Sequence, residues 1–122
     1  MLKNAINWFE IPVSDMTRAT SFYENMLQTT FKQESMNGMD MAIFPYEDTA
    51  ITGALVSAPF LSPANTGTVV YINVEGMLDA AIERAVEKGS EITLPKMDIG
   101  ENGFIAHIID SEGNRVGLHS IS

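Results

Sequence analysis

The chain has 122 residues, a length that suits one domain with a hydrophobic core. It contains no cysteine, which excludes disulfide bonds and thiolate metal ligands, and its formal net charge of -9 argues against nucleic acid as a partner. The chain contains no run of about 20 apolar residues, so we expect neither a transmembrane helix nor a membrane partner. The opening segment MLKNAINWFE lacks the features of a signal peptide, and we expect a cytoplasmic protein.

The first predicted strand lies in INWFEIPVSD, residues 6–15, and its two faces differ. Because side chains alternate across a strand, one face is apolar and the other is mixed. The apolar face carries Phe9, Ile11 and Val13, and the mixed face carries Trp8, Glu10 and Pro12. The apolar face is typical of a core. A large aromatic beside a carboxylate is uncommon in a core, so the mixed face is not expected to pack against the core.

A helix and three extended segments are predicted next. Apolar residues at three- and four-residue spacings predict a helix over 16–27, and Ser14 or Asp15 can cap its N-terminus. The extended segments are expected at residues 31–36, 39–44 and 50–57. Asn37-Gly38, between the first two segments, is typical of a two-residue hairpin turn.

The pattern restarts after residues 58–67, APFLSPANTG, whose composition is that of a linker. TVVYINVEG predicts a strand, and residues 77–88 predict a helix with Gly89 just beyond its end. Three extended segments are again expected, at residues 91–94, 104–110 and 115–120. Residues 95–103, PKMDIGENG, are predicted to be irregular, either as a lid over the cavity or as a plain loop.

The order β-α-β-β-β therefore occurs twice, with VSDM and VEGM aligned at an offset of 61 residues. This repeat predicts an α+β fold, a single domain over residues 1–122. Its first βαβββ module is predicted at 1–57, its linker at 58–67 and its second module at 68–122. Each helix would cover the core face of its sheet, and the opposite faces would form a curved, cup-shaped groove of ligand size.

Three segments carry a resemblance to a known family: EIPVSDMTRATSFYENML, YINVEGMLDAAIERAVEKGSEI and GFIAHIIDSEGNRVGLHS. In this order and spacing they resemble the vicinal oxygen chelate superfamily. It includes glyoxalase I, bleomycin-resistance proteins, extradiol dioxygenases and fosfomycin-resistance enzymes. The third segment resembles the family's D-P-D-G-N hairpin, with Ser111 and Glu112 in place of Pro and Asp. The likeness is greatest to uncharacterised proteins related to lactoylglutathione lyase, and it implies a curved mixed-sheet cup and a homodimer.

The resemblance also implies four ligand positions for a divalent metal, and this chain departs from the pattern at each. Three positions hold Trp8, Val69 and Gly117. The fourth belongs on the segment 50–57, which contains no Asp, Glu or His. These side chains cannot coordinate a metal, so we expect no metal ligands and no cofactor.

Six residues are candidates for ligand binding in the cup: Trp8, Glu10, Tyr71, Asn73, His107 and His119. The side that His107 faces is implied by the resemblance. Trp8 either stacks on a flat or cationic ligand or fills the space left by metal and substrate. Glu10, His107 and His119 are the candidate catalytic residues, through acid–base chemistry. They could also form a solvated carboxylate and a cross-strand histidine pair, or a displaced metal site.

Residues 110–114 have the composition of a turn, with Gly113 or Asn114 able to adopt a positive φ. The function we expect is binding of a small molecule by a glyoxalase/bleomycin-resistance-like protein without the family metal. The alternative is a lyase or isomerase related to lactoylglutathione lyase, using Glu10, His107 and His119. A third hypothesis is a structural or sensing module whose cup face is a subunit interface.

Overall fold

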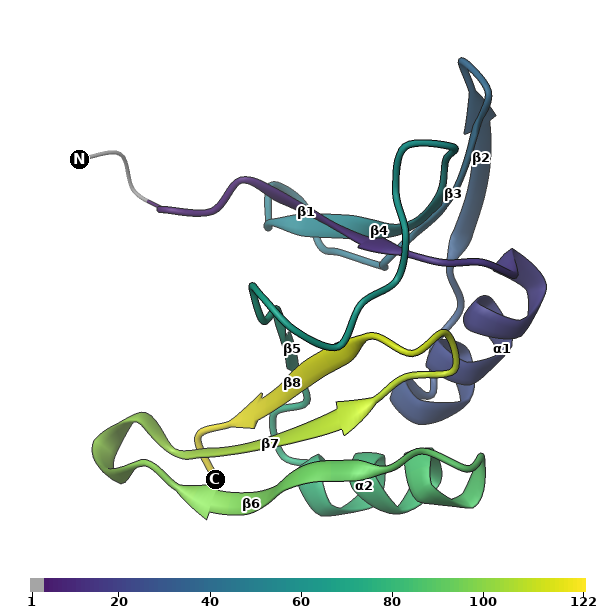
Figure 1. Cartoon of the computed structure of the whole chain (residues 1–122). Helices are drawn as coiled ribbons and strands as arrows, with labels where there is room; N and C mark the ends of the chain where they lie inside the picture. Colours follow the sequence, from purple (N-terminus) through teal and green to yellow (C-terminus); the bar gives the residue numbers. More distant parts are fainter. Residues whose placement is uncertain (1–3) are drawn as a thin grey trace.

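The computed structural model describes residues 4–122, so the start of the predicted first module and of the segment assessed for a signal peptide lies outside the described residues. The strands form two four-stranded mixed sheets, with strand orders β1-β4-β3-β2 and β5-β8-β7-β6. In Figure 1 the sheets form the upper and lower arms of a C-shaped molecule, with α1 and α2 on its outer side. This α+β architecture is the one predicted from the repeat.

The first half of the chain contains β1 (Trp8–Pro12), α1 (Met16–Leu27), β2 (Lys32–Met36), β3 (Met39–Ile43) and β4 (Thr52–Ser57). Local sequence signals explain the boundaries. The Asp15 side chain caps α1 by accepting a hydrogen bond from the Arg18 amide. Asn37 and Gly38 have φ values of 51° and 77°, as a two-residue hairpin turn between β2 and β3 requires.

The second half contains β5 (Tyr71–Asn73), α2 (Leu78–Glu87), β6 (Ile92–Asp98), β7 (Phe104–Ile109) and β8 (Arg115–Ser120), with a short 3-10 helix at Gly100–Asn102. Gly89 follows α2 with a φ of 92°, in agreement with the predicted helix end. β5 has only three residues, so the strand predicted in TVVYINVEG is shorter than its apolar pattern indicates.

The prediction of an irregular stretch over 95–103 is wrong for its first half. β6 continues to Asp98, because Met97 and Asp98 still pair with Ile105 and Phe104 of β7. Pro95 lies where the β6–β7 register shifts, and at such an irregularity its missing amide donor is tolerated.

One hydrophobic core joins the two halves. It contains Ile11 and Val13 of the first half and Ile72 and Val74 of the second, all of them buried. Helices α1 and α2 contact each other on this side of the sheets. The core face predicted for the first strand is therefore correct, and Trp8, on the opposite face, is 44% exposed.

The first strand of each half leaves one edge without a partner in its own sheet. β1 pairs only with β4, and β5 pairs only with β8, both in parallel. Among residues 4–122, no helix is long and apolar enough to cross a membrane.

Candidate functional site

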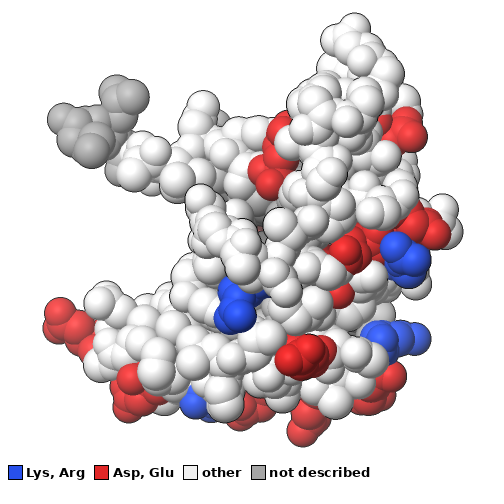
Figure 2. Space-filling view, in the orientation of Figure 1, with Lys and Arg blue, Asp and Glu red and all other residues white. Residues whose placement is uncertain are grey.

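A cavity of about 880 Å³ lies between the edge strands β1 and β5. Its walls are mainly apolar and aromatic, including Trp8, Phe9, Phe44, Ile51, Tyr71 and Met77. Glu10 is the only charged residue among the described residues that line it. The space-filling view is hollowed between the upper and lower arms, and much of the exposed surface there is uncharged (Figure 2). We call this cavity the β1–β5 groove.

Trp8 and Glu10 form one side of the groove. They lie two residues apart on β1, so both side chains project from the same face of the strand. The Trp8 indole Nε1 donates a hydrogen bond to Glu10 Oε2 over 3.2 Å. This bond orients the indole and places a carboxylate next to its ring.

Tyr71 and Asn73 line the groove from β5. The Tyr71 ring lies against Gly117, where an added Cβ would collide with the ring. Asn73 accepts a hydrogen bond from the Glu75 amide at its side-chain oxygen over 2.9 Å, which leaves its amide group as a donor. The second side of the groove therefore combines a tyrosine and an asparagine.

His107 lies behind Tyr71. Its Nε2 is 2.7 Å from the Tyr71 hydroxyl, and its Nδ1 is 3.3 Å from Arg115 Nη1. Burial, and to a smaller extent the Arg115 charge, lower the pKa of His107 below its usual 6.5. His107 is not a lining residue of the groove, but it reaches the groove through the Tyr71 hydroxyl.

His119 lies apart from this group. Its Nε2 is 2.7 Å from the backbone oxygen of Asn102, beyond the end of β6, and it does not line the groove. Within residues 4–122, no group of three or more His, Asp or Glu side chains is placed to hold a metal ion. Glu10, His107 and His119 come from three different strands with separate partners, so the structure does not gather them into a metal site.

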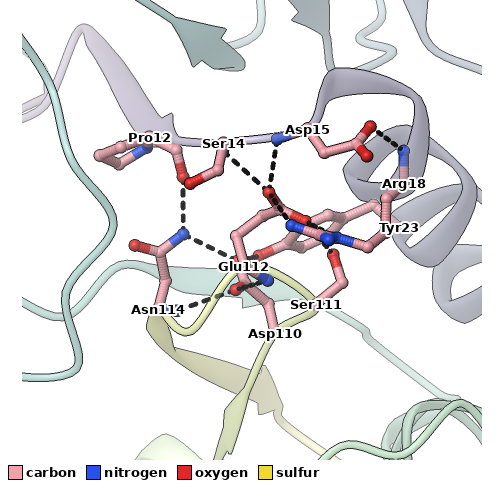
Figure 3. Close-up of polar contacts among 9 residues, drawn as sticks. All are labelled: Pro12, Ser14, Asp15, Arg18, Tyr23, Asp110, Ser111, Glu112 and Asn114. Atoms are coloured by element: carbon pink, nitrogen blue, oxygen red, sulfur yellow. Dashed lines mark hydrogen bonds and ion pairs between the residues drawn. The ribbon is translucent and has the colours of Figure 1, made fainter.

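A polar cluster that the sequence reasoning missed joins the two halves at the end of β1 and the start of α1 (Figure 3). Glu112 has a fully buried side chain that pairs with Arg18 over 2.7 Å. It also accepts hydrogen bonds from the amides of Ser14 and Asp15, each over 2.8 Å, at the start of α1. Burial opposes ionisation, but the bonds from Arg18 and these amides outweigh it and lower the pKa of Glu112 to about 2.

Asp110 and Asn114 extend this cluster. Asp110 accepts a hydrogen bond from the buried Tyr23 hydroxyl over 2.7 Å, and Asn114 donates from Nδ2 to the Pro12 oxygen over 2.7 Å. Burial, with the Asp110 charge next, raises the pKa of Tyr23 well above its usual value. The turn predicted at 110–114 is correct, with Gly113 at a φ of 92°. The only sequence signal that this turn also joins the two halves was Glu112, which stands where the family's hairpin has Asp.

Comparisons with known proteins agree with this fold. The model of the Glyoxalase/Bleomycin resistance protein/Dioxygenase superfamily matches residues 5–118. Proteins named "Putative glyoxylase CFP32" in Mycobacterium bovis and Mycobacterium tuberculosis are 27% identical over 118 residues, which cover 92% of this chain. The chain spans less than half of these relatives, 44% of their length.

Solved structures are similar at lower identity. The fosfomycin resistance protein FosX of Listeria monocytogenes has a TM-score of 0.67 at 15% identity, covering 98% of this chain and 91% of its own. A glyoxalase I variant from Zea mays has a TM-score of 0.66 at 19% identity, covering 94% of this chain and 45% of its own. The family match extends over nearly the whole chain, and the predicted vicinal oxygen chelate fold is confirmed. The chain belongs to the Glyoxalase/Bleomycin resistance protein/Dioxygenase superfamily.

Proposed function

We propose that the protein binds a flat, neutral or cationic small molecule in the β1–β5 groove. The observation that carries this proposal is the groove itself, a cavity of about 880 Å³ with aromatic walls. Ligand pockets typically span roughly 300–1,000 Å³, with apolar linings and a few polar groups that fix orientation. Trp8, Tyr71 and Asn73 supply that combination on two facing strands.

The charge of the groove supports a ligand without negative charge. Glu10 is the only charged side chain among its described lining residues, and no Lys or Arg joins it there. A bound anion would therefore lack a compensating charge, whereas a flat cation can contact both the Glu10 carboxylate and the Trp8 ring.

The proposal also holds that the ligand binds without the family metal. A FosX structure from Listeria monocytogenes contains Mn(II) and sulfate. In this chain, Trp8, Val69 and Gly117 stand at positions where the family resemblance implies ligands, and the Tyr71 ring fills the space beside Gly117. These residues do not fit a divalent metal at that place.

Probes of nearly equal shape but different charge test the proposal. 1-Methylquinolinium is a flat cation, quinoline is its neutral counterpart near pH 7, and naphthalene-2-sulfonate is an anion. Trp8 is the only tryptophan, so its fluorescence reports on the groove. We expect the cation and quinoline to change this fluorescence and the anion to have no effect.

Replacing Glu10 with Gln keeps the shape of the side chain and removes its charge. We expect E10Q to weaken binding of 1-methylquinolinium by about threefold to tenfold while leaving quinoline unchanged. E47Q is the matched control, because Glu47 is exposed and does not line the groove. Preferential binding of the sulfonate, or an equal effect of E47Q, would contradict the proposal.

A second candidate is a lyase or isomerase that uses Glu10, His107 and His119. The name of the curated relatives and the short contact between His107 and Tyr71 favour it. The separate partners of the three residues favour binding without catalysis. Turnover of the methylglyoxal–glutathione adduct that H107A abolishes, with or without added Zn, Ni or Mn, would establish the enzyme.

We also propose that the protein is a homodimer. The strands β2 and β6 are sheet edges, and Met36 and Met97 on them are exposed. Light scattering at micromolar concentration should give twice the chain mass. A dimer that covers Trp8 and shields it from all three probes would instead support the hypothesis that the cup face is a subunit interface.

A further inference from the structure

Tyr71 connects the β1–β5 groove to a polar pair on the neighbouring strands. Tyr71 lines the groove and is 44% exposed, while its hydroxyl lies 2.7 Å from His107 Nε2. On the far side of the imidazole, Nδ1 lies 3.3 Å from Arg115 Nη1. Arg115 is held in turn by a hydrogen bond from its Nε to the Asn65 oxygen over 3.1 Å.

This chain of contacts fixes the direction of each proton. A guanidinium can only donate, so His107 Nδ1 must accept from Arg115. The pKa of His107 is lowered by burial and by Arg115, so the ring is neutral near pH 7 and its one proton lies on Nε2. Nε2–H then donates to the Tyr71 oxygen. The Tyr71 proton therefore cannot serve His107 and is left for another acceptor.

We propose that Tyr71 is the hydrogen-bond donor of the β1–β5 groove, held in that role by His107 and Arg115, and that the groove ligand carries a carbonyl-type acceptor. This inference rests on the proposed function and adds the group that the ligand must present. Tyr71 contacts the ligand, whereas His107 and Arg115 are positioning residues.

A matched pair of probes isolates the acceptor. 3-Acetyl-1-methylpyridinium and 3-ethyl-1-methylpyridinium are flat cations of similar size, and only the first has a carbonyl oxygen. The protein should bind the acetyl probe about threefold to tenfold more tightly, the worth of one hydrogen bond. Y71F keeps the ring and removes the hydroxyl, so it should abolish this preference for the acetyl probe.

Substitutions of Arg115 test whether it directs the Tyr71 proton through His107 or serves the structure alone. R115M removes the donor to Nδ1, so His107 can place its proton there and accept from the Tyr71 hydroxyl at Nε2. The acetyl preference should fall, although Arg115 is not among the described residues of the groove lining. R115K keeps a donor of the same charge and should restore part of the preference.

The nitrogen spectra of His107 give a readout that needs no ligand. Long-range proton–nitrogen correlation in the parent protein should show protonated Nε2 and unprotonated Nδ1. A proton on Nδ1 would overturn the inference, as would equal binding of both probes in the parent and Y71F proteins. If neither probe binds, the proposed function fails for flat cations, and the His107 tautomer alone decides whether the Tyr71 proton is directed as inferred.

Discussion

The turns that precede β4 and β8 occupy equivalent places in the two halves, yet they have opposite surroundings. Each leads into the strand that pairs in parallel with the first strand of its own half. The turn at 110–114 is packed against β1 and α1 by a polar cluster. The turn at 47–51 ends at the β1–β5 groove, where Ile51 is a lining residue.

The residue directly before each strand illustrates this contrast. Asn114, directly before β8, donates to the Pro12 oxygen and accepts from the Ala64 amide. Ile51, directly before β4, has no polar side-chain atom and shares the groove wall with Asn73. The two modules are thus joined by hydrogen bonds at the 110–114 turn, whereas the 47–51 turn borders the β1–β5 groove.

The comparison separates stability from binding. Changes in the 110–114 turn should alter the free energy of unfolding and leave the groove probes unaffected. Changes around the groove should do the reverse, because Trp8 and Tyr71 are each 44% exposed and neither belongs to the hydrophobic core. The predictions below test this separation, beginning with the largest effect.

Replacing Asp110 with Ala should lower the free energy of unfolding by about 3–5 kcal/mol. The substitution leaves the fully buried Tyr23 hydroxyl without its acceptor and the Asn114 amide without one of its two acceptors. Urea denaturation measures the effect. The matched control is Glu47→Ala at the corresponding turn, where the exposed side chain should contribute less than about 0.5 kcal/mol. Equal losses in the two variants would contradict the contrast between the turns.

Glu112 should make stability depend on acid pH. Its pKa is about 2 in the folded protein against 4.5 for an ordinary Glu, so the unfolded chain binds the proton more readily. Stabilisation by Glu112 is therefore complete above about pH 4.5 and lost as the pH falls toward about 2.

Glu112→Gln removes this dependence and isolates it from that of other carboxyl groups. The unfolding free energy of the parent should exceed that of the variant by about 2–3 kcal/mol at pH 7, a gap that closes as the pH falls to 2. Denaturation at a series of pH values measures the gap. A gap that stays constant with pH would show that the Arg18 pair does not hold the carboxylate ionised.

Local rules predicted most of the fold. The alternation around Trp8 and Ile11 predicted the two faces of β1, a cap at Ser14 or Asp15 predicted the start of α1, and Asn37-Gly38 predicted the hairpin. Each depends on neighbours in the sequence. The extent of β6 does not, because pairing with β7 continues beyond an irregularity that the sequence presents as a loop.

The site was predictable only as far as strand faces allow. Alternation brought Trp8 and Glu10 together, and the repeat added Tyr71 and Asn73 on the facing strand, all four of which line the groove. Contacts across the fold were not predictable in this way. Glu112 meets Ser14 across 98 positions of sequence, and no local pattern connects them.

The smallest expected effect concerns His107, which contacts Tyr71 of the β1–β5 groove. His107 should titrate below its ordinary pKa of 6.5. Burial is the larger cause and Arg115 the smaller, so Arg115→Gln should raise the pKa partway and not fully to 6.5. In the parent protein, the unfolded chain takes up the His107 proton more readily than the folded protein does, because the folded pKa is lower. The free energy of unfolding should therefore fall slightly as the pH drops through 6.5. A proton-detected titration of the His107 ring measures the pKa directly.

Lys88→Gln is the matched control, since it removes one positive charge from an exposed position beyond the end of α2 and should leave the pKa of His107 unchanged. If both substitutions shift the His107 pKa equally, the effect of Arg115 is one of net charge and not of its contact with Nδ1.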